Sequence, residues 1–177
     1  MVDIEDNGPR PALWSGRHFT SKVSARVQIP IASFEAWFRA VPLEKILPAH
    51  GIVAATVGSR AITGTWNDPG ARRRVLQADG SSAIEEVLTR DPSGSFTYMV
   101  WGFRQPMGLL VRYGRGAFTF APAGPNATDI TWEYHFAPSS PLAVPLLALM
   151  IRAAFRPFMQ ASIAAIRDVA EREVALR

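Results

Sequence analysis

The chain has 177 residues, of which 48% are hydrophobic and 19% charged, so size and composition indicate one folded domain with a sizeable core. It contains no cysteine, which excludes disulfides, thiolate metal sites and a cysteine nucleophile. The formal net charge of +4 is a mild basic excess, below that of a dedicated nucleic-acid binder.

Residues 1–18 predict a polar N-terminal arm, and residues 19–177 predict the folded domain. The arm carries acidic residues early and has no apolar centre, which is unlike a secretory signal. The longest apolar run, Pro141 to Ile151, is too short to span a bilayer. We therefore expect a cytoplasmic protein with no integral membrane segment.

The first strand and two short helices are expected next along the chain. Apolar residues alternate over 21–30, which is typical of a half-buried strand. A helix is predicted over 31–41, where apolar residues have helical spacing, and Pro42 can open a second short helix that ends near residue 47.

Short runs rich in Val, Ile, Thr and aromatic residues, separated by turn signals such as Asp79-Gly80, fill the middle of the chain. This spacing predicts consecutive antiparallel strands joined by hairpins. The expected strands cover about 52–58, 71–78, 82–90, 95–103, 110–121 and 128–137.

Helical periodicity returns after Ser140, with apolar residues stepping by three or four to the end of the chain. Pro145 and Pro157 are each expected to remove a backbone hydrogen bond and bend this helix. A curved sheet covered by a single helix leaves its core incompletely filled near the short helices, so a cavity is expected there.

The order of elements resembles the START-like or helix-grip superfamily (SRPBCC-type), and within it the polyketide cyclase/dehydrase and lipid-transport group. The likeness covers roughly residues 19 to 172. It rests on "SFEAWFRAVP" after the first strand, "GARRRV" with "ADGSSAIEEVL", "SFTYMV", and "TDITWEYHFAP" before the last helix. It implies an α+β helix-grip fold, in which a curved seven-stranded antiparallel sheet wraps a long C-terminal helix and two short helices follow the first strand.

The run Arg72-Arg73-Arg74 alternates faces within a strand, so it cannot form one basic patch. We expect solvated arginines at a strand end, paired with Glu85 or Glu86, and no nucleic-acid site. An arginine that points inward would need a carboxylate or an anionic ligand. The resemblance places Glu85 at the cavity mouth, where it could act as an acid or base; a cross-strand salt bridge is the alternative.

The last hairpin supplies an aromatic face. Trp132 and Tyr134 share the face that must turn toward the helix, and pairing across the turn adds Phe118 and Phe120. Arg112 has the same inward parity and is a candidate for holding a ligand carboxylate or phenolate. Gly114 and Gly116 are interpreted as bulge or curvature sites, and Glu133 and His135 as outward residues.

We therefore expect a small or medium hydrophobic ligand (a lipid, polyketide or aromatic metabolite) between the sheet and the last helix. The residues expected to contact it are Glu85, Tyr98, Arg112, Phe118, Phe120, Trp132, Tyr134, Phe155, Phe158 and Ser162. One alternative is a cyclase or dehydratase in the same cavity, with Glu85 or Tyr98 moving a proton. A protein-interaction domain without ligand is the other.

No cofactor or metal is expected. His18, His50 and His135 make no metal-ligand spacing, and the chain has neither a G-x-S-x-G motif nor a phosphate-binding loop after a strand. A homodimer is left open by the sequence.

Overall fold

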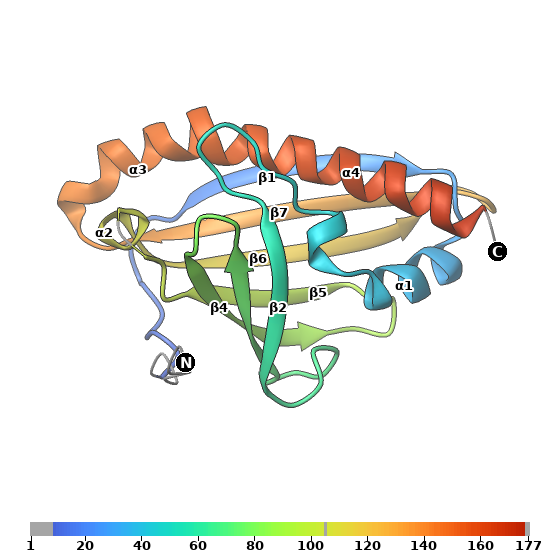
Figure 1. Cartoon of the computed structure of the whole chain (residues 1–177), viewed down its shortest axis with the longest axis horizontal. Helices are drawn as coiled ribbons and strands as arrows, with labels where there is room; N and C mark the ends of the chain where they lie inside the picture. The colour runs from blue at the N-terminus through green and yellow to red at the C-terminus, as the bar shows by residue number, and fades with distance from the viewer. Residues whose placement is uncertain (1–8, 105, 176–177) are drawn as a thin grey trace.

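The computed structural model describes residues 9–104 and 106–175 and contains a seven-stranded antiparallel sheet in the order β1-β7-β6-β5-β4-β3-β2 (Figure 1). The first strand pairs with the last, and the other neighbours are consecutive hairpins. The strands are β1 (Phe19–Val27), β2 (Thr56–Thr63), β3 (Arg72–Gln77), β4 (Ser82–Arg90), β5 (Phe96–Trp101), β6 (Val111–Pro122) and β7 (Thr128–Pro138).

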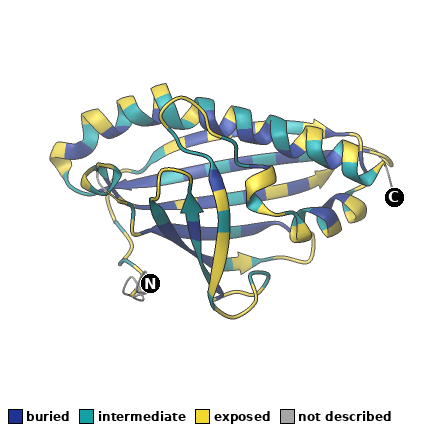
Figure 2. Ribbon diagram, in the orientation of Figure 1, coloured by how far each residue is buried: buried dark blue, intermediate teal, exposed yellow. Residues whose placement is uncertain are grey.

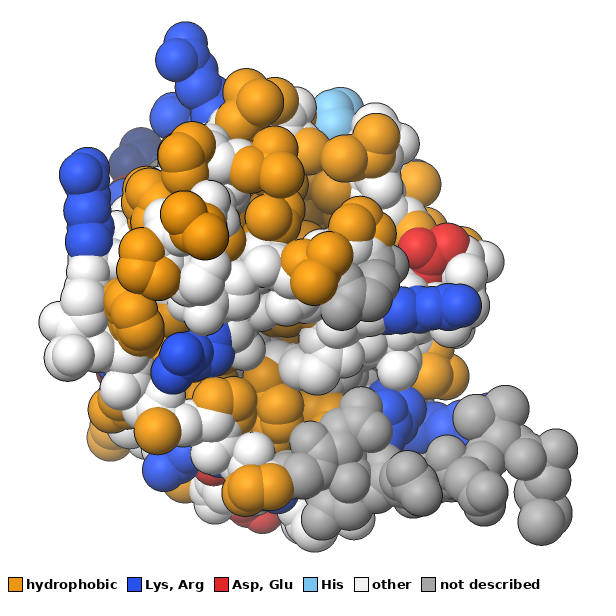
Figure 3. All heavy atoms as spheres, turned by 90° about the vertical axis from the view of Figure 1, so that its left-hand side faces the viewer, with side chains coloured by type: hydrophobic (Ala, Val, Ile, Leu, Met, Phe, Trp, Pro, Cys, Tyr) orange, Lys and Arg blue, Asp and Glu red, His pale blue; other side chains and the backbone are white. Residues whose placement is uncertain are grey.

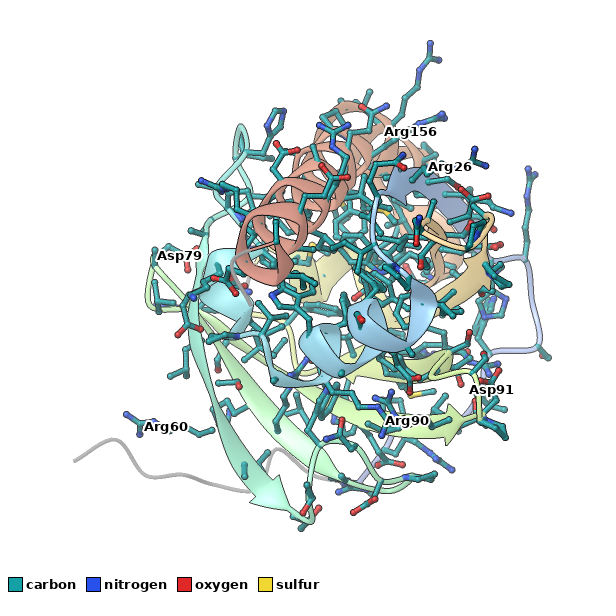
Figure 4. The ribbon with its side chains drawn as sticks, turned by 90° about the vertical axis from the view of Figure 1, so that its right-hand side faces the viewer. Arg26, Arg60, Asp79, Arg90, Asp91 and Arg156 are labelled. Carbon is teal, nitrogen blue, oxygen red and sulfur yellow. The ribbon has the colours of Figure 1, made fainter. Side chains whose placement is uncertain are left out.

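Two short helices, α1 (Ile31–Ala40) and the 3-10 turn η1 (Leu43–Lys45), follow β1, and α2 (Met107–Leu110) precedes β6. After β7 the chain stays helical through η2 (Pro141–Ala143), α3 (Val144–Met150), the π-helical turn η3 (Ile151–Phe155) and α4 (Arg156–Val174). These segments form one long helix across the concave side of the sheet (Figure 1). Seen end-on, Arg26 of β1 and Arg60 of β2 lie at opposite edges of the curved sheet, with the helix between those edges (Figure 4). The predicted helix-grip fold is confirmed.

The main core lies between the concave face and the helices, where the buried residues of Figure 2 face one another. From α1, Phe34 and Trp37 enter this core. The Trp37 Nε1–H donates to Glu173 Oε2 at 2.9 Å, and Lys45 Nζ lies 2.7 Å from Glu173 Oε1. These contacts attach both short helices to the end of α4.

A second apolar cluster, not expected from the sequence, lies on the opposite face of the sheet. Met99, Trp101 and Tyr113 form its centre, and Trp14 of the N-terminal arm packs against it. The Trp14 backbone N–H donates to the Tyr113 hydroxyl at 2.8 Å. The arm from Pro9 onward therefore covers apolar surface, while residues 1–8 of the predicted arm lie outside the described residues.

The predicted strand at 52–58 is misplaced, since β2 covers Thr56–Thr63. Ile52 and Val53 have strand-forming side chains, but they lie in a turn held by a lone bridge between His50 and Val53. Without a neighbouring strand to pair with, their β propensity does not produce a strand. The short helix α2 was also not predicted.

The two prolines of the terminal helix act differently from each other. Pro145 lies in the first turn of α3, where its missing N–H costs no helical hydrogen bond, so the predicted loss of a hydrogen bond there is wrong. Pro157 follows η3, in which the Arg156 N–H donates to the Ile151 carbonyl, five residues back. The helix accommodates this proline by widening into a π turn, a device often found beside functional sites.

Candidate functional site

A cavity of about 380 Å³ lies between the concave face and the helical run from Met150 to Phe158. Residues from every strand except β1 contribute to its wall, and it extends to η1, the 52–54 turn and α2. Seven of the predicted ligand contacts line it: Glu85, Tyr98, Phe118, Trp132, Tyr134, Phe155 and Phe158. The sheet and the helix thus leave a hollow beside the π turn.

Aromatic rings form most of the cavity wall. Phe118 and Trp132, directly opposite in the β6–β7 register, stack with centroids 5.0 Å apart. Phe155 meets the edge of Tyr134 at 5.0 Å and lies 5.7 Å from Phe158. Strand alternation places Phe118, Trp132 and Tyr134 on one face of the sheet, and the terminal helix supplies Phe155 and Phe158. Apolar surface on a ligand would be buried against these rings.

Two buried phenols, Tyr98 and Tyr134, add hydrogen-bonding groups to this wall. The Trp132 Nε1–H donates to the Tyr98 hydroxyl at 2.9 Å, and the Tyr98 and Tyr134 rings meet edge to face with centroids 5.7 Å apart. Burial raises the pKa of both phenols, and the negative charge of Glu85 raises the pKa of Tyr98 further. Both therefore stay protonated at neutral pH, so Tyr98 can donate a proton or a hydrogen bond but is not a base.

A buried ion pair completes the polar part of the cavity. Arg73 of β3 pairs with Glu85 of β4, with Nη2 and Oε2 2.6 Å apart, and both residues line the cavity. The side chains are only 15% and 11% exposed. The Arg73 guanidinium also lies 3.5 Å from the centre of the Trp66 ring. Glu85 is thus both a cavity residue and a partner in a cross-strand salt bridge, two roles the sequence posed as alternatives.

The neighbouring pair, Arg72 and Glu86, lies on the other face of the sheet with Nε and Oε2 2.7 Å apart. Arg10 of the arm also reaches Glu86 at 2.9 Å. The predicted alternation of the arginine run is confirmed, but Arg73 is largely buried instead of solvated.

Arg112 does not reach the cavity, which corrects the prediction from parity. It is exposed, and its guanidinium lies 5.1 Å from the Trp14 ring on the outer face. The cause is an irregularity in the ladder, because Val111 pairs with Pro138 while Tyr113 pairs with Ala137. Arg112 is the extra residue of this bulge, which reverses the parity at the start of β6.

Two other expected contacts lie outside the cavity wall. Phe120 packs against Phe34 and Phe38 of α1, with centroids 5.3 and 5.2 Å away. Ser162 is fully buried in α4, and in the described part of the chain its hydroxyl has no hydrogen-bond partner.

Gly114 and Gly116 occupy regular inward positions of β6, not the bulge itself. A Cβ on Gly114 would lie 3.0 Å from the Tyr134 ring, and one on Gly116 would overlap the Tyr98 ring. These glycines let the two phenols lie directly on the backbone. Glu133 and His135, 3.1 Å apart, lie on the outer face as expected.

Sequence reasoning missed Arg73 and Trp66 as cavity residues. Arg73 could have been found, because residues 73 and 85 are each six positions from Asp79 and pair across the β3–β4 hairpin. Trp66 lies in the loop after β2 and carried no such signal. Within residues 9–104 and 106–175, no three His, Asp or Glu side chains gather in a way that could hold a metal ion.

The class of protein defined by this fold and cavity is a helix-grip domain. Among solved structures, the Zhui aromatase/cyclase from Streptomyces sp. R1128 is similar with a TM-score of 0.70 and 14% identity, over 89% of this chain and 96% of that one. Norcoclaurine synthase from Thalictrum flavum, solved with dopamine and hydroxybenzaldehyde, matches with a TM-score of 0.61 and 15% identity over 91% and 96%. Ara h 8.0201 matches with 0.61 and 16% identity over 86% and 97%. At these identities the likeness shows the fold alone.

The family described as polyketide cyclase / dehydrase and lipid transport matches residues 20–171. This chain therefore belongs to that family, which supports a role in binding or cyclising a hydrophobic molecule. No curated protein matches the chain.

Proposed function

We propose that the protein binds a small or medium hydrophobic ligand that carries at least one polar oxygen, in the cavity between the sheet and the terminal helix. The observation that carries this proposal is the pairing of an aromatic wall with a compact polar group inside one hollow of about 380 Å³. Ligand pockets typically measure about 300–1,000 Å³ and combine apolar walls with a few placed polar groups.

The affinity would come mainly from apolar burial against Phe118, Trp132 and Phe155. Each Å² of apolar surface removed from water contributes about 25 cal/mol before ordering costs. The Arg73–Glu85 pair and the Tyr98 hydroxyl would then fix the orientation of a hydroxyl or carbonyl group on the ligand.

Native mass spectrometry of the purified protein tests for a retained ligand, and titration with anilinonaphthalene sulfonate measures an apolar probe in the same cavity. The variant Ala154→Phe places a ring where Ala154 lines the cavity, and should weaken probe binding by about tenfold or more. If the probe binds Ala154→Phe as tightly as the unaltered protein and no ligand is retained, ligand binding in this cavity is refuted.

A matched pair of variants separates the polar part of the cavity from general effects on the sheet. Glu85 and Glu86 are adjacent, both buried and both paired with arginine, but only Glu85 lines the cavity. Glu85→Gln should change the affinity for a retained ligand, whereas Glu86→Gln should leave it unchanged.

A cyclase or dehydratase is the second candidate, favoured by the buried phenol of Tyr98 near the Glu85 carboxylate. The family description and the similar aromatase/cyclase point the same way. In a dehydration, Glu85 would remove the proton next to a carbonyl, and Tyr98 would protonate the departing hydroxyl. Tyr98→Phe should then abolish turnover of a polyketide-like substrate, a far larger effect than the modest loss of affinity that follows from removing one hydrogen bond. The cavity favours either candidate over a protein-interaction domain without ligand.

A further inference from the structure

Four exposed leucines gather at the end of the molecule where α2 and α3 lie. Leu142, Leu146 and Leu149 are 92%, 54% and 60% exposed, and Leu109 of α2 is 63% exposed. The spacing of the first three, four and then three residues, puts them on one side of the helix. Figure 3 looks onto this end of the molecule and shows hydrophobic side chains gathered over it. We call these four residues the leucine face.

The leucine face lies beside the exposed part of the cavity wall, formed by Ile52, Asp79, Arg104 and Pro106, which we call the cavity mouth. Met107 and Leu110 of α2 and Met150, the last residue of α3, all line the cavity. Ile52 of the neighbouring turn also lines it while being 85% exposed. Apolar surface therefore continues from the hollow outward onto the exterior at this end.

The segments that build the leucine face carry arginines and no acids. Neither residues 92–128 nor residues 134–167 contain an aspartate or glutamate. Arg104 borders the cavity mouth, and Arg152 follows Leu149 by about one helical turn; both are exposed. Asp79, which also borders the mouth, interacts electrostatically with Arg104. The leucines are thus flanked by positive charge.

The terminal helix is more apolar than its packing requires. Pro141–Val174 is long and apolar enough to cross a membrane by length and composition, with a mean hydropathy of 1.6 in its most apolar window, yet only 39% of that window is buried. Because α4 packs along β1 and cannot leave the sheet without opening the core, the helix can meet a bilayer only side-on. A helix with apolar residues on one side and arginines at its flanks is typical of an interfacial orientation.

We propose that the leucine face docks on the surface of an anionic lipid bilayer. The leucines enter the boundary between headgroups and acyl chains, and Arg104 and Arg152 contact the lipid phosphates. Docking in this orientation turns the cavity mouth toward the bilayer, so that an apolar molecule can pass between them without crossing bulk water. The proposal goes beyond ligand binding and rests on the exposed leucines and Arg152, which lie outside the cavity wall, and on Arg104 at its edge.

Vesicle flotation tests this docking with the full chain, using vesicles of phosphatidylcholine alone and of phosphatidylcholine mixed with phosphatidylglycerol. The protein should float with the mixed vesicles, and less with phosphatidylcholine alone or at high salt. The double variant Leu142→Gln, Leu149→Gln should lower partitioning by about tenfold or more, since two exposed leucines no longer enter the acyl region. Arg152→Gln should lower binding to the mixed vesicles only.

The matched control is Leu13→Gln, which alters a leucine that is 67% exposed but lies beside Trp14 on the arm. It should float like the unaltered protein. Absence of flotation with the mixed vesicles, or flotation that Leu142→Gln, Leu149→Gln leaves unchanged, overturns the proposal. So does light scattering that shows a dimer which the double variant splits, because a second copy would then cover the leucine face. Titration of Leu142→Gln, Leu149→Gln with anilinonaphthalene sulfonate in solution distinguishes this proposal from ligand binding. The affinity of the cavity for the probe should be unchanged in this variant.

Discussion

Neutralising one partner of the Arg73–Glu85 pair should destabilise the protein far more than neutralising both. The two side chains are 15% and 11% exposed and their charged atoms lie 2.6 Å apart. Removing one partner of a buried ion pair typically costs about 3–5 kcal/mol, because a charge is left without compensation. The bordering cavity can admit water to the remaining guanidinium, so we expect about 3 kcal/mol for Glu85→Gln.

The double variant Arg73→Met, Glu85→Gln removes both charges and should cost only about 1 kcal/mol relative to the unaltered protein. Urea denaturation followed by circular dichroism gives the free energy of unfolding for each corner of this double-mutant cycle. If Glu85→Gln costs less than about 1 kcal/mol, or if the double variant is no more stable than the single one, the pair is not the buried, mutually dependent unit described above.

Three further changes test other parts of the site. Gly116→Ala would push a methyl into the Tyr98 ring and should lower the free energy of unfolding by about 1–3 kcal/mol, measured in urea. Folding raises the pKa of Tyr98, so its contribution to the free energy of unfolding should be fully present below about pH 10. Above that pH the unfolded phenol ionises first, and the free energy of unfolding should decline. Tyr98→Phe should make this decline less steep in urea titrations from neutral to alkaline pH. Pro157→Ala should restore the α-helical hydrogen bond, close the π turn and alter probe affinity more than stability.

The sheet was predictable because turn residues in the sequence separate most of its strands. Turn signals such as Asp79-Gly80 separate the hairpins, and alternation assigned Trp132 and Tyr134 to the concave face that the structure shows. The long terminal helix was equally visible in its apolar spacing. These features depend on local chemistry and on period, which a single sequence carries.

The errors fall where pairing, not composition, decides the outcome. The bulge at Arg112 moves that side chain to the opposite face of the sheet, and no residue type in the sequence locates the bulge at this position. The Ile52–Val53 segment has strand-like composition but no partner strand. The second apolar face, with Trp14 over Tyr113, depends on a contact between residues 99 positions apart.

Gly114 and Gly116 influence the size of the ligand that the cavity can accept. Because Gly114 and Gly116 have no Cβ, the Tyr134 and Tyr98 rings pack directly against the main chain of β6. A methyl group at either position would push the neighbouring tyrosine ring into the cavity and reduce the cavity volume. The absence of these two Cβ atoms thus contributes to the volume of the cavity. A related protein with alanine at either position would have a smaller cavity and would accept a smaller ligand.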